Sequence, residues 1–325
     1  MNLPQNTKIS IIIPTYNSSL FIERTMASVL KQTFNNWELI IVDDCSNDNT
    51  YSILKKFEGI DKRIKVFKTL KNSGGPTVPK NIGFKKTTGE YIAYLDHDDE
   101  WLPEKLEKQI MVFENTKDPK LGLVSCGANL INTKNKIFSI YKPIIKKKYL
   151  PEILLRNPIY SNSSVLIKKE VIDAIGPRDE NMKYSEDWEM WIRIIINGYN
   201  INFINQPLFN YYFHNNNVTK TLKDKLVKVR DAEYVFKKYY NTYSKYNYLH
   251  IGYFRLGVMY LLGGDIKTSR LNFMRSIKLK NFFIPAYIGY LLSFLNILGI
   301  LVINFLIFLY RILKGKIYLL KTTNS

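Results

Sequence analysis

Four short apolar runs alternate with helical patterns over the first hundred residues. The apolar runs span residues 8–14, 37–43, 63–67 and 91–95. The helical patterns span residues 20–31, 50–57 and 78–86, the second of them preceded by Asp48 as a capping residue. Strands that alternate with helices predict an α/β fold with a doubly wound parallel sheet. Such sheets bind ligands beyond the carboxyl ends of their strands.

Polar residues directly follow three of these strands, at residues 14–17, 43–47 and 96–99. The densest set is Asp96-His-Asp-Asp-Glu100, with four carboxylates in five positions. Carboxylates this close repel one another unless a cation lies among them, and oxygen ligands on a short loop suit Mg2+ or Mn2+. Such an ion neutralises a substrate diphosphate. The alternative is a solvated acidic turn that caps a helix at Glu104.

Positive charge is concentrated at the back of the chain. Of the formal net charge of +19, +13 lies in residues 221–325, and residues 281–310 contain no Asp, Glu, Lys, Arg or His. A basic segment beside so long an apolar run indicates an anionic membrane surface rather than nucleic acid. Basic residues on both sides of the run favour a shallow or re-entrant hairpin broken near Gly299. The alternative is a buried helix of a soluble domain.

The chain contains two cysteines, Cys45 and Cys126. This number excludes a disulfide scaffold and fits a reducing compartment. Residues 1–8 lack the basic-then-apolar profile of a secretory signal, so we expect the N-terminal part to stay in the cytoplasm. Together with the apolar run, this predicts a protein at the cytoplasmic face of the cell membrane.

Several motifs occur together in one order and spacing. They are Ile11-Ile-Ile-Pro-Thr-Tyr-Asn17, Ser28-Val-Leu-Lys-Gln-Thr-Phe34, Glu38-Leu-Ile-Ile-Val-Asp-Asp-Cys-Ser46, Gly89-Glu-Tyr-Ile-Ala-Tyr-Leu-Asp-His-Asp-Asp99, Ser163-Ser-Val-Leu-Ile-Lys-Lys169, Ile175-Gly176 with Asp179-Glu180, and Glu186-Asp-Trp-Glu-Met-Trp-Ile-Arg193. As a set they resemble the family 2 glycosyltransferases, over roughly residues 8–218. The resemblance implies a Rossmann-like GT-A fold. It also implies transfer of a sugar from a nucleotide-diphosphate donor to an acceptor hydroxyl, with inversion at the anomeric carbon.

The resemblance assigns the nucleotide side of the site to the first two strand ends. Pro14, Thr15 and Tyr16 would bound the nucleoside pocket together with Asp44, which would accept a hydrogen bond from the base. Lys80 stands where the family usually has Arg, and it keeps the charge but loses the bidentate geometry of a donor contact.

The acidic turn would form the metal site. Asp96 would face the ribose or the metal, and Asp98, with Asp99 beside it, would hold a Mn2+ or Mg2+ ion that bridges the diphosphate. His214 is either a further ligand or a structural residue. His97 lies inside the turn, and no chemistry is assigned to it.

Inversion requires a base on the face opposite the leaving group, and Asp187 fits that role. Glu186 and Asp187 open a helix anchored by apolar residues, and the positive end of a helix lowers a carboxylate pKa and keeps the group ionised. A positioned carboxylate contributes about 10^2- to 10^4-fold in rate as a general base. Plain helix capping is the alternative for both residues.

The pattern predicts three regions. Residues 1–218 form the GT-A domain, with a donor half of about 1–100 and an acceptor half of about 101–218. Residues 219–280 form a helical connector that ends in a tetratricopeptide-like hairpin. Residues 281–325 form a hydrophobic membrane-associating segment with a basic tail. Between the two halves, the basic loop at residues 142–148 either meets an anionic acceptor or is simply solvated.

The resemblance, together with the apolar run, implies an enzyme, a membrane-associated inverting glycosyltransferase of surface polysaccharide synthesis. Its donor would be a UDP-sugar by default, and its acceptor a hydroxyl of a glycan or lipid-linked glycan. The alternative is a catalytically inactive nucleotide-sugar-binding or scaffold protein of the same fold at the membrane. A nucleotidyltransferase would need a Gly-rich basic phosphate loop after the first strand, where this chain has Pro14-Thr-Tyr-Asn17. No nucleic-acid-binding module is recognisable.

Overall fold

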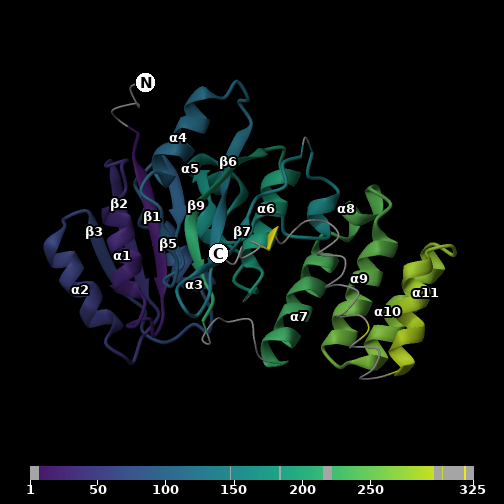
Figure 1. Cartoon of the computed structure of the whole chain (residues 1–325). Coiled ribbons are helices and arrows are strands. Elements are labelled where there is room, and N and C mark those ends of the chain that lie inside the picture. The colour runs from purple at the N-terminus through teal and green to yellow at the C-terminus, as the bar shows by residue number, and fades with distance from the viewer. Residues whose placement is uncertain are drawn as a thin grey trace, which may run out of the picture. The chain divides into compact units, whose positions relative to one another are not determined.

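The computed structural model describes residues 7–146, 148–182, 184–214, 222–295, 302 and 318–319. These residues fall into two compact units (Figure 1). The first, called the catalytic unit below, contains the described residues up to 146, those from 158 to 214, and 318–319. The second, called the helical unit, contains residues 148–157, 222–295 and 302.

The front of the catalytic unit is a parallel sheet. Its strands are β1 (Ile9–Thr15), β2 (Trp37–Asp43), β3 (Ile64–Lys68) and β4 (Tyr91–Tyr94). β1 lies between β2 and β4, and β3 pairs with β2, all in parallel. Figure 1 labels β1, β2 and β3 of this sheet. The four predicted strands are therefore present within about a residue of their expected bounds.

The back half makes the sheet mixed rather than wholly parallel. Its strands are β5 (Glu100–Trp101), β6 (Leu121–Ile131), β7 (Ile137–Tyr141), β8 (Leu166–Lys168), β9 (Asn200–Tyr212) and β10 (Tyr318–Leu319). The strand order is β10-β7-β6-β8-β4-β1-β2-β3, and β9 pairs with β5 and β6. The parallel arrangement predicted for the first four strands is present, whereas β8, for which no direction was predicted, is antiparallel to β4 and β6. The 3₁₀ helix η2 (Asn162–Ser164) leads into β8 without the helical crossover that a parallel strand requires.

Helices cover both faces of the sheet. They are α1 (Ile22–Leu30), α2 (Thr50–Ile60), α3 (Thr77–Phe84), α4 (Lys105–Asn115), α5 (Lys169–Ile175) and α6 (Glu186–Ile196). α1, α2 and α4 bury apolar side chains against the face that carries Ile11 and Leu39. α3 packs on the other face, where a Cβ at Gly83 would lie 2.7 Å from Ile12. The doubly wound arrangement is thus confirmed for the parallel strands.

The helical unit consists of short helices around a small aromatic core. They are the 3₁₀ helix η1 (Glu152–Leu154), α7 (Leu222–Lys238), α8 (Tyr240–Lys245), α9 (Leu249–Leu262), α10 (Ile266–Leu279), α11 (Ile284–Leu292) and the 3₁₀ helix η3 (Ser293–Leu295). α9, α10 and α11 stand side by side (Figure 1). Glycines at 257 and 289 let α9 and α11 approach Phe273 of α10 closely.

The predicted membrane segment is only partly described. Residues 281–295 contain α11 and η3, whereas most of residues 296–310, including Gly299, and most of the basic tail lie outside the described residues. No helix in the described part of the chain is both long enough and apolar enough to cross a bilayer.

Candidate active site

The three polar strand ends lie next to one another. Thr15 and Asp43 are paired across β1 and β2, and the Asp44 N–H donates to the Thr15 carbonyl at 2.8 Å. On the other side, His97 Nδ1 lies 3.3 Å from the Pro14 carbonyl oxygen. The fold therefore brings residues 14–16, 44 and 96–99 to a single edge of the sheet.

At the nucleotide side, Asp44 braces a loop. Its buried carboxylate accepts hydrogen bonds from the Thr69 hydroxyl at 3.0 Å and from the Ser73 N–H and hydroxyl at 2.9 and 2.8 Å. Thr15 is buried as well, whereas the Tyr16 side chain is 42% exposed. The Tyr16 side chain is thus accessible to a ligand, whereas the Asp44 carboxylate, predicted to accept from the base, is engaged by Thr69 and Ser73.

The carboxylates of the acidic turn diverge instead of clustering. Asp99 is buried and accepts from the Ser163 hydroxyl at 2.5 Å and the Ser161 hydroxyl at 3.4 Å. Burial, and after it the charges of Asp98 and Asp96, raise the pKa of Asp99 well above its usual range. Asp99 therefore faces the protein interior, and its predicted role as a metal ligand is not supported by its position.

Asp98 is held against His214, with Oδ2 and Nε2 2.9 Å apart. Phe21 stacks on the imidazole at a centroid distance of 4.4 Å. Burial raises the pKa of Asp98, but the hydrogen bond with His214 and the attraction of His97 and His214 outweigh it, so the net shift is downward. Among the residues that the structure describes, no three His, Cys, Asp or Glu side chains converge to hold an ion by themselves.

Two residues of α1 that the sequence analysis did not select fix the turn. Arg24 Nη2 donates to the Asp98 carbonyl at 2.8 Å, and its guanidinium lies 3.4 Å from the ring centroid of Tyr212. The Thr25 hydroxyl is within 2.9 Å of the His97 carbonyl and 2.8 Å of the Asp99 carbonyl. The sequence feature that could have identified Thr25 is a polar residue on the apolar, buried face of an amphipathic helix.

On the opposite side, Glu186 and Lys80 form a buried ion pair. Lys80 Nζ lies 3.0 Å from Glu186 Oε1 and 3.5 Å from Asp96 Oδ1. Arg178 Nη1 lies 3.6 Å from the same Glu186 oxygen. Lys80 and Glu186 are each at most 2% exposed. Neither therefore presents its charge to a ligand, contrary to the predicted donor contact of Lys80 and the predicted catalytic role of Glu186.

Asp187 is the second residue of α6 and is half-buried. Burial, followed by the charge of the neighbouring Glu186, raises the pKa of Asp187 to about 6. The expected lowering by the helix N-terminus is therefore wrong, because desolvation and a like charge outweigh it. A carboxylate with this pKa is still mostly ionised at neutral pH and accepts a proton more readily than an exposed Asp.

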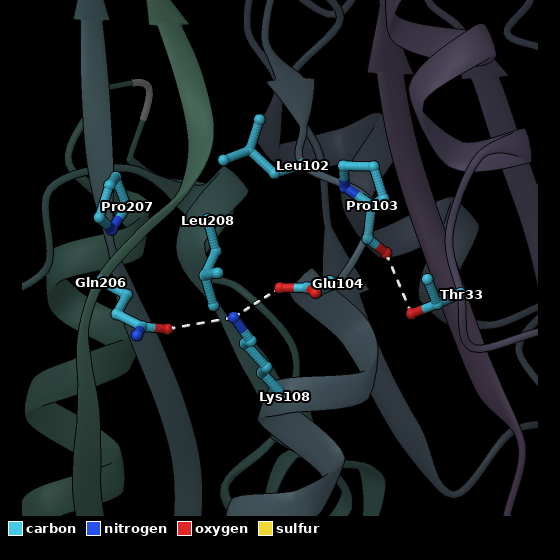
Figure 2. Close-up of a pocket in the computed structure, with 8 residues that line it drawn as sticks. All are labelled: Thr33, Leu102, Pro103, Glu104, Lys108, Gln206, Pro207 and Leu208. Carbon is cyan, nitrogen blue, oxygen red and sulfur yellow. Dashed lines mark hydrogen bonds and ion pairs between the residues drawn. The ribbon is translucent and has the colours of Figure 1, made fainter.

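A shallow pocket of about 570 Å³ lies elsewhere on the catalytic unit (Figure 2). Its lining residues are Thr33, Leu102, Pro103, Glu104, Lys108, Gln206, Pro207 and Leu208. Lys108 Nζ spans it, bonded to Gln206 Oε1 at 3.2 Å and Glu104 at 2.5 Å (Figure 2). The pocket contains none of the predicted site residues.

Comparison with known proteins identifies the family. Residues 10–176 match the sequence profile of Glycosyl transferase family 2. The chain belongs to this family. It is 34% identical over 216 residues to the putative teichuronic acid biosynthesis glycosyltransferase TuaG of Bacillus subtilis (strain 168), covering 65% of this chain and 81% of TuaG. It is 33% identical over 200 residues to WfgD of Escherichia coli, a UDP-Glc:alpha-D-GlcNAc-diphosphoundecaprenol beta-1,3-glucosyltransferase, covering 61% of this chain and 73% of WfgD.

Solved structures agree on the fold of this family 2 glycosyltransferase. TarS of S. aureus (residues 1–349) in complex with UDP-GlcNAc aligns with a TM-score of 0.59 at 18% identity, covering 88% of this chain and 90% of that one. The mannosyltransferase PcManGT of Pyrobaculum calidifontis, in complex with GDP-Man and Mn2+, aligns with a TM-score of 0.56 at 15% identity, covering 90% of this chain and 85% of that one. The predicted GT-A fold and enzyme class are confirmed.

Proposed function

We propose that this enzyme is an inverting glycosyltransferase of surface polysaccharide synthesis, with its donor side at the acidic turn and Asp187 as its base. The contact that carries the proposal is made by Lys80. Its amine touches Asp96 of the turn at 3.5 Å and Glu186, the neighbour of Asp187, at 3.0 Å. Residues about ninety positions apart thus form two walls of one site, as direct displacement between donor and acceptor requires.

The donor side is suited to a nucleoside diphosphate. The exposed Tyr16 and the loop braced by Asp44 bound the nucleoside, and Asp96, half-buried, faces the ribose or the ion. Asp98 and His214 present a carboxylate oxygen and an imidazole nitrogen 2.9 Å apart, a donor set that suits Mn2+ when diphosphate oxygens complete the site. A bound Mn2+ or Mg2+ would stabilise the charge that develops on the leaving nucleotide.

On the acceptor side, Asp187 takes the proton of the attacking hydroxyl. Its helix is anchored by Trp188, Trp191 and Ile192, all buried, so the carboxylate is held in place. The displaced nucleoside diphosphate leaves on the side of the acidic turn, and the new glycosidic bond forms with inverted configuration.

The relatives suggest the substrates. WfgD is named for a UDP-Glc donor and a diphosphoundecaprenol-linked acceptor, and TarS binds UDP-GlcNAc. We therefore propose a UDP-sugar as donor and a lipid-linked or surface glycan as acceptor. PcManGT binds GDP-Man with Mn2+ in the same fold, so GDP is the competing nucleotide to test.

A thermal-shift panel tests the donor site. We expect UDP with Mn2+ to raise the melting temperature by several degrees, because a ligand that binds only the folded state stabilises it. GDP, dTDP and CMP, each with and without Mn2+, serve as comparisons. If no nucleotide shifts the melting temperature, the donor site is absent. Binding without any turnover of a UDP-sugar favours the inactive scaffold alternative.

We also propose that the helical unit binds an anionic membrane surface. Large apolar side chains stand exposed on and around α10 and α11, among them Phe282 at 93%, Ile284 at 67% and Leu291 at 66%. Residues 266–295 contain five Lys or Arg residues and no Asp or Glu. Exposed aromatic and aliphatic side chains beside cations are the composition that anionic lipid attracts.

Vesicle flotation tests the membrane proposal. The full chain is expected to float with vesicles containing phosphatidylglycerol and to float less with pure phosphatidylcholine. The double change Phe282→Asp with Leu291→Asp should weaken flotation by about tenfold or more, because each exposed apolar side chain loses its burial in lipid. Ile60→Asp, an equally exposed position of the catalytic unit, is the control and should float as the wild type does. Undiminished flotation of the double variant would contradict the proposal.

A further inference from the structure

Glu186, the residue before Asp187 in α6, belongs to a triad of buried charges with Lys80 and Arg178. Glu186 Oε1 is 3.0 Å from Lys80 Nζ and 3.6 Å from Arg178 Nη1. All three side chains are at most 3% exposed. Because little water separates these groups, their charges act on one another and on Asp187 with weak screening.

Neighbouring side chains hold Arg178 of this triad in place on two sides. The Arg178 guanidinium lies 4.3 Å from the ring centroid of Tyr94, and its Nη2 donates to Asn162 Oδ1 at 2.8 Å. Its buried Nε has no hydrogen-bond partner in the described part of the chain. Replacing buried charges by apolar packing is often neutral or stabilising, so stability alone does not account for this triad.

The signs of the three charges determine how the triad affects the ionisation of Asp187. Lys80 and Arg178 are positive and Glu186 is negative, so the three carry a net charge of +1, and an ionised Asp187 makes the set neutral. Glu186 opposes a second negative charge on the adjacent residue, and the two cations favour it. Lys80 comes from α3, Arg178 from the segment between α5 and α6, and Glu186 from α6 itself.

We infer that Glu186, Lys80 and Arg178 are positioning residues that set the proton affinity of Asp187 and act on the reaction only through it. This inference rests on the proposed role of Asp187 as the base. Burial and the charge of Glu186 raise the pKa of Asp187, and Arg178 and Lys80 act in the opposite direction. The balance leaves a carboxylate that is ionised at neutral pH yet more basic than an exposed Asp, as a general base requires.

A direct titration of Asp187 tests the inference without any substrate. The full chain is labelled with 13C at the aspartate carboxyl carbons, and the signal that is missing in Asp187→Asn is assigned to Asp187. In the wild type we expect a midpoint of about 6. Glu186→Gln should lower that midpoint, and Lys80→Met should raise it, each by about one pH unit. Lys80→Arg keeps the positive charge, so the midpoint of Asp187 in this variant should equal that of the wild type.

The matched control is Glu189→Gln on the same helix. Glu189 is equally buried and pairs with Arg193 at 2.9 Å, and the change should leave the midpoint of Asp187 unmoved. If Lys80→Met does not fold, Glu186→Gln still tests the triad. An Asp187 midpoint that stays unchanged or rises in Glu186→Gln overturns the inference. Failure of the proposed function has a different signature, which is full turnover by Asp187→Asn.

Discussion

Asp187→Asn is expected to lower turnover by about 10^2- to 10^4-fold, the contribution of a positioned general base. The amide has nearly the same shape as the carboxylate, so the packing of Trp188 and Trp191 in α6 is kept. It cannot accept a proton from the attacking hydroxyl. The measurement is the rate of UDP release from a saturating UDP-sugar, with the polysaccharide precursor or water as acceptor.

The pH profile gives the same prediction a second readout. Because the pKa of Asp187 is raised to about 6, the wild-type kcat/KM should be level above that pH and fall about tenfold per unit below it, as the base becomes protonated. Asp173→Asn is the control, an exposed carboxylate of α5 paired with Lys169 at 2.7 Å, and it should show wild-type rates. Wild-type turnover in Asp187→Asn would assign the base to another group.

Local sequence patterns predicted the helices and strands well where turn and capping residues mark their ends. The hairpin predicted at the end of the helical connector is present as α9 and α10, which Gly263-Gly-Asp265 separates. Gly264 takes a positive φ of 86°, and Asp265 accepts from the Thr268 N–H at 3.0 Å as the cap of α10. The parallel direction of the first four strands follows equally from alternating patterns, since parallel pairing accommodates the intervening helices.

The direction in which each carboxylate points could not be predicted from its position in the sequence. Asp98 and Asp99 are neighbours, yet one contacts His214 and the other is buried against Ser163. A turn has no sequence periodicity from which the direction of each side chain could be predicted. The partners of Asp98 and Asp99 also lie more than sixty residues away in the sequence. The burial of Lys80 was missed for the same reason, because its partner Glu186 is 106 positions further along the chain.

The second large effect is expected from Asp98→Ala. Without this carboxylate, Mn2+-dependent binding of UDP should weaken by at least about tenfold, equivalent to about 1.4 kcal/mol, because only the His214 imidazole remains where a carboxylate oxygen and an imidazole nitrogen lay together. Binding of UDP without metal should change little. Calorimetric titration of UDP into the protein, with and without Mn2+, separates the two quantities.

Asp99→Asn provides the contrast that makes the Asp98 result specific. The Asp99 side chain faces Ser161 and Ser163 in the interior. An amide oxygen at this position can still accept hydrogen bonds from those two hydroxyl groups. We therefore expect Asp99→Asn to keep Mn2+-dependent UDP binding within about twofold of the wild type, a difference of about 0.4 kcal/mol. If Asp99→Asn loses that binding and Asp98→Ala retains it, the two carboxylates exchange roles, and the contact between Asp98 and His214 is purely structural. Equal losses in both variants would instead mean that the whole turn, held by Arg24 and Thr25, moves as one unit when either carboxylate is changed.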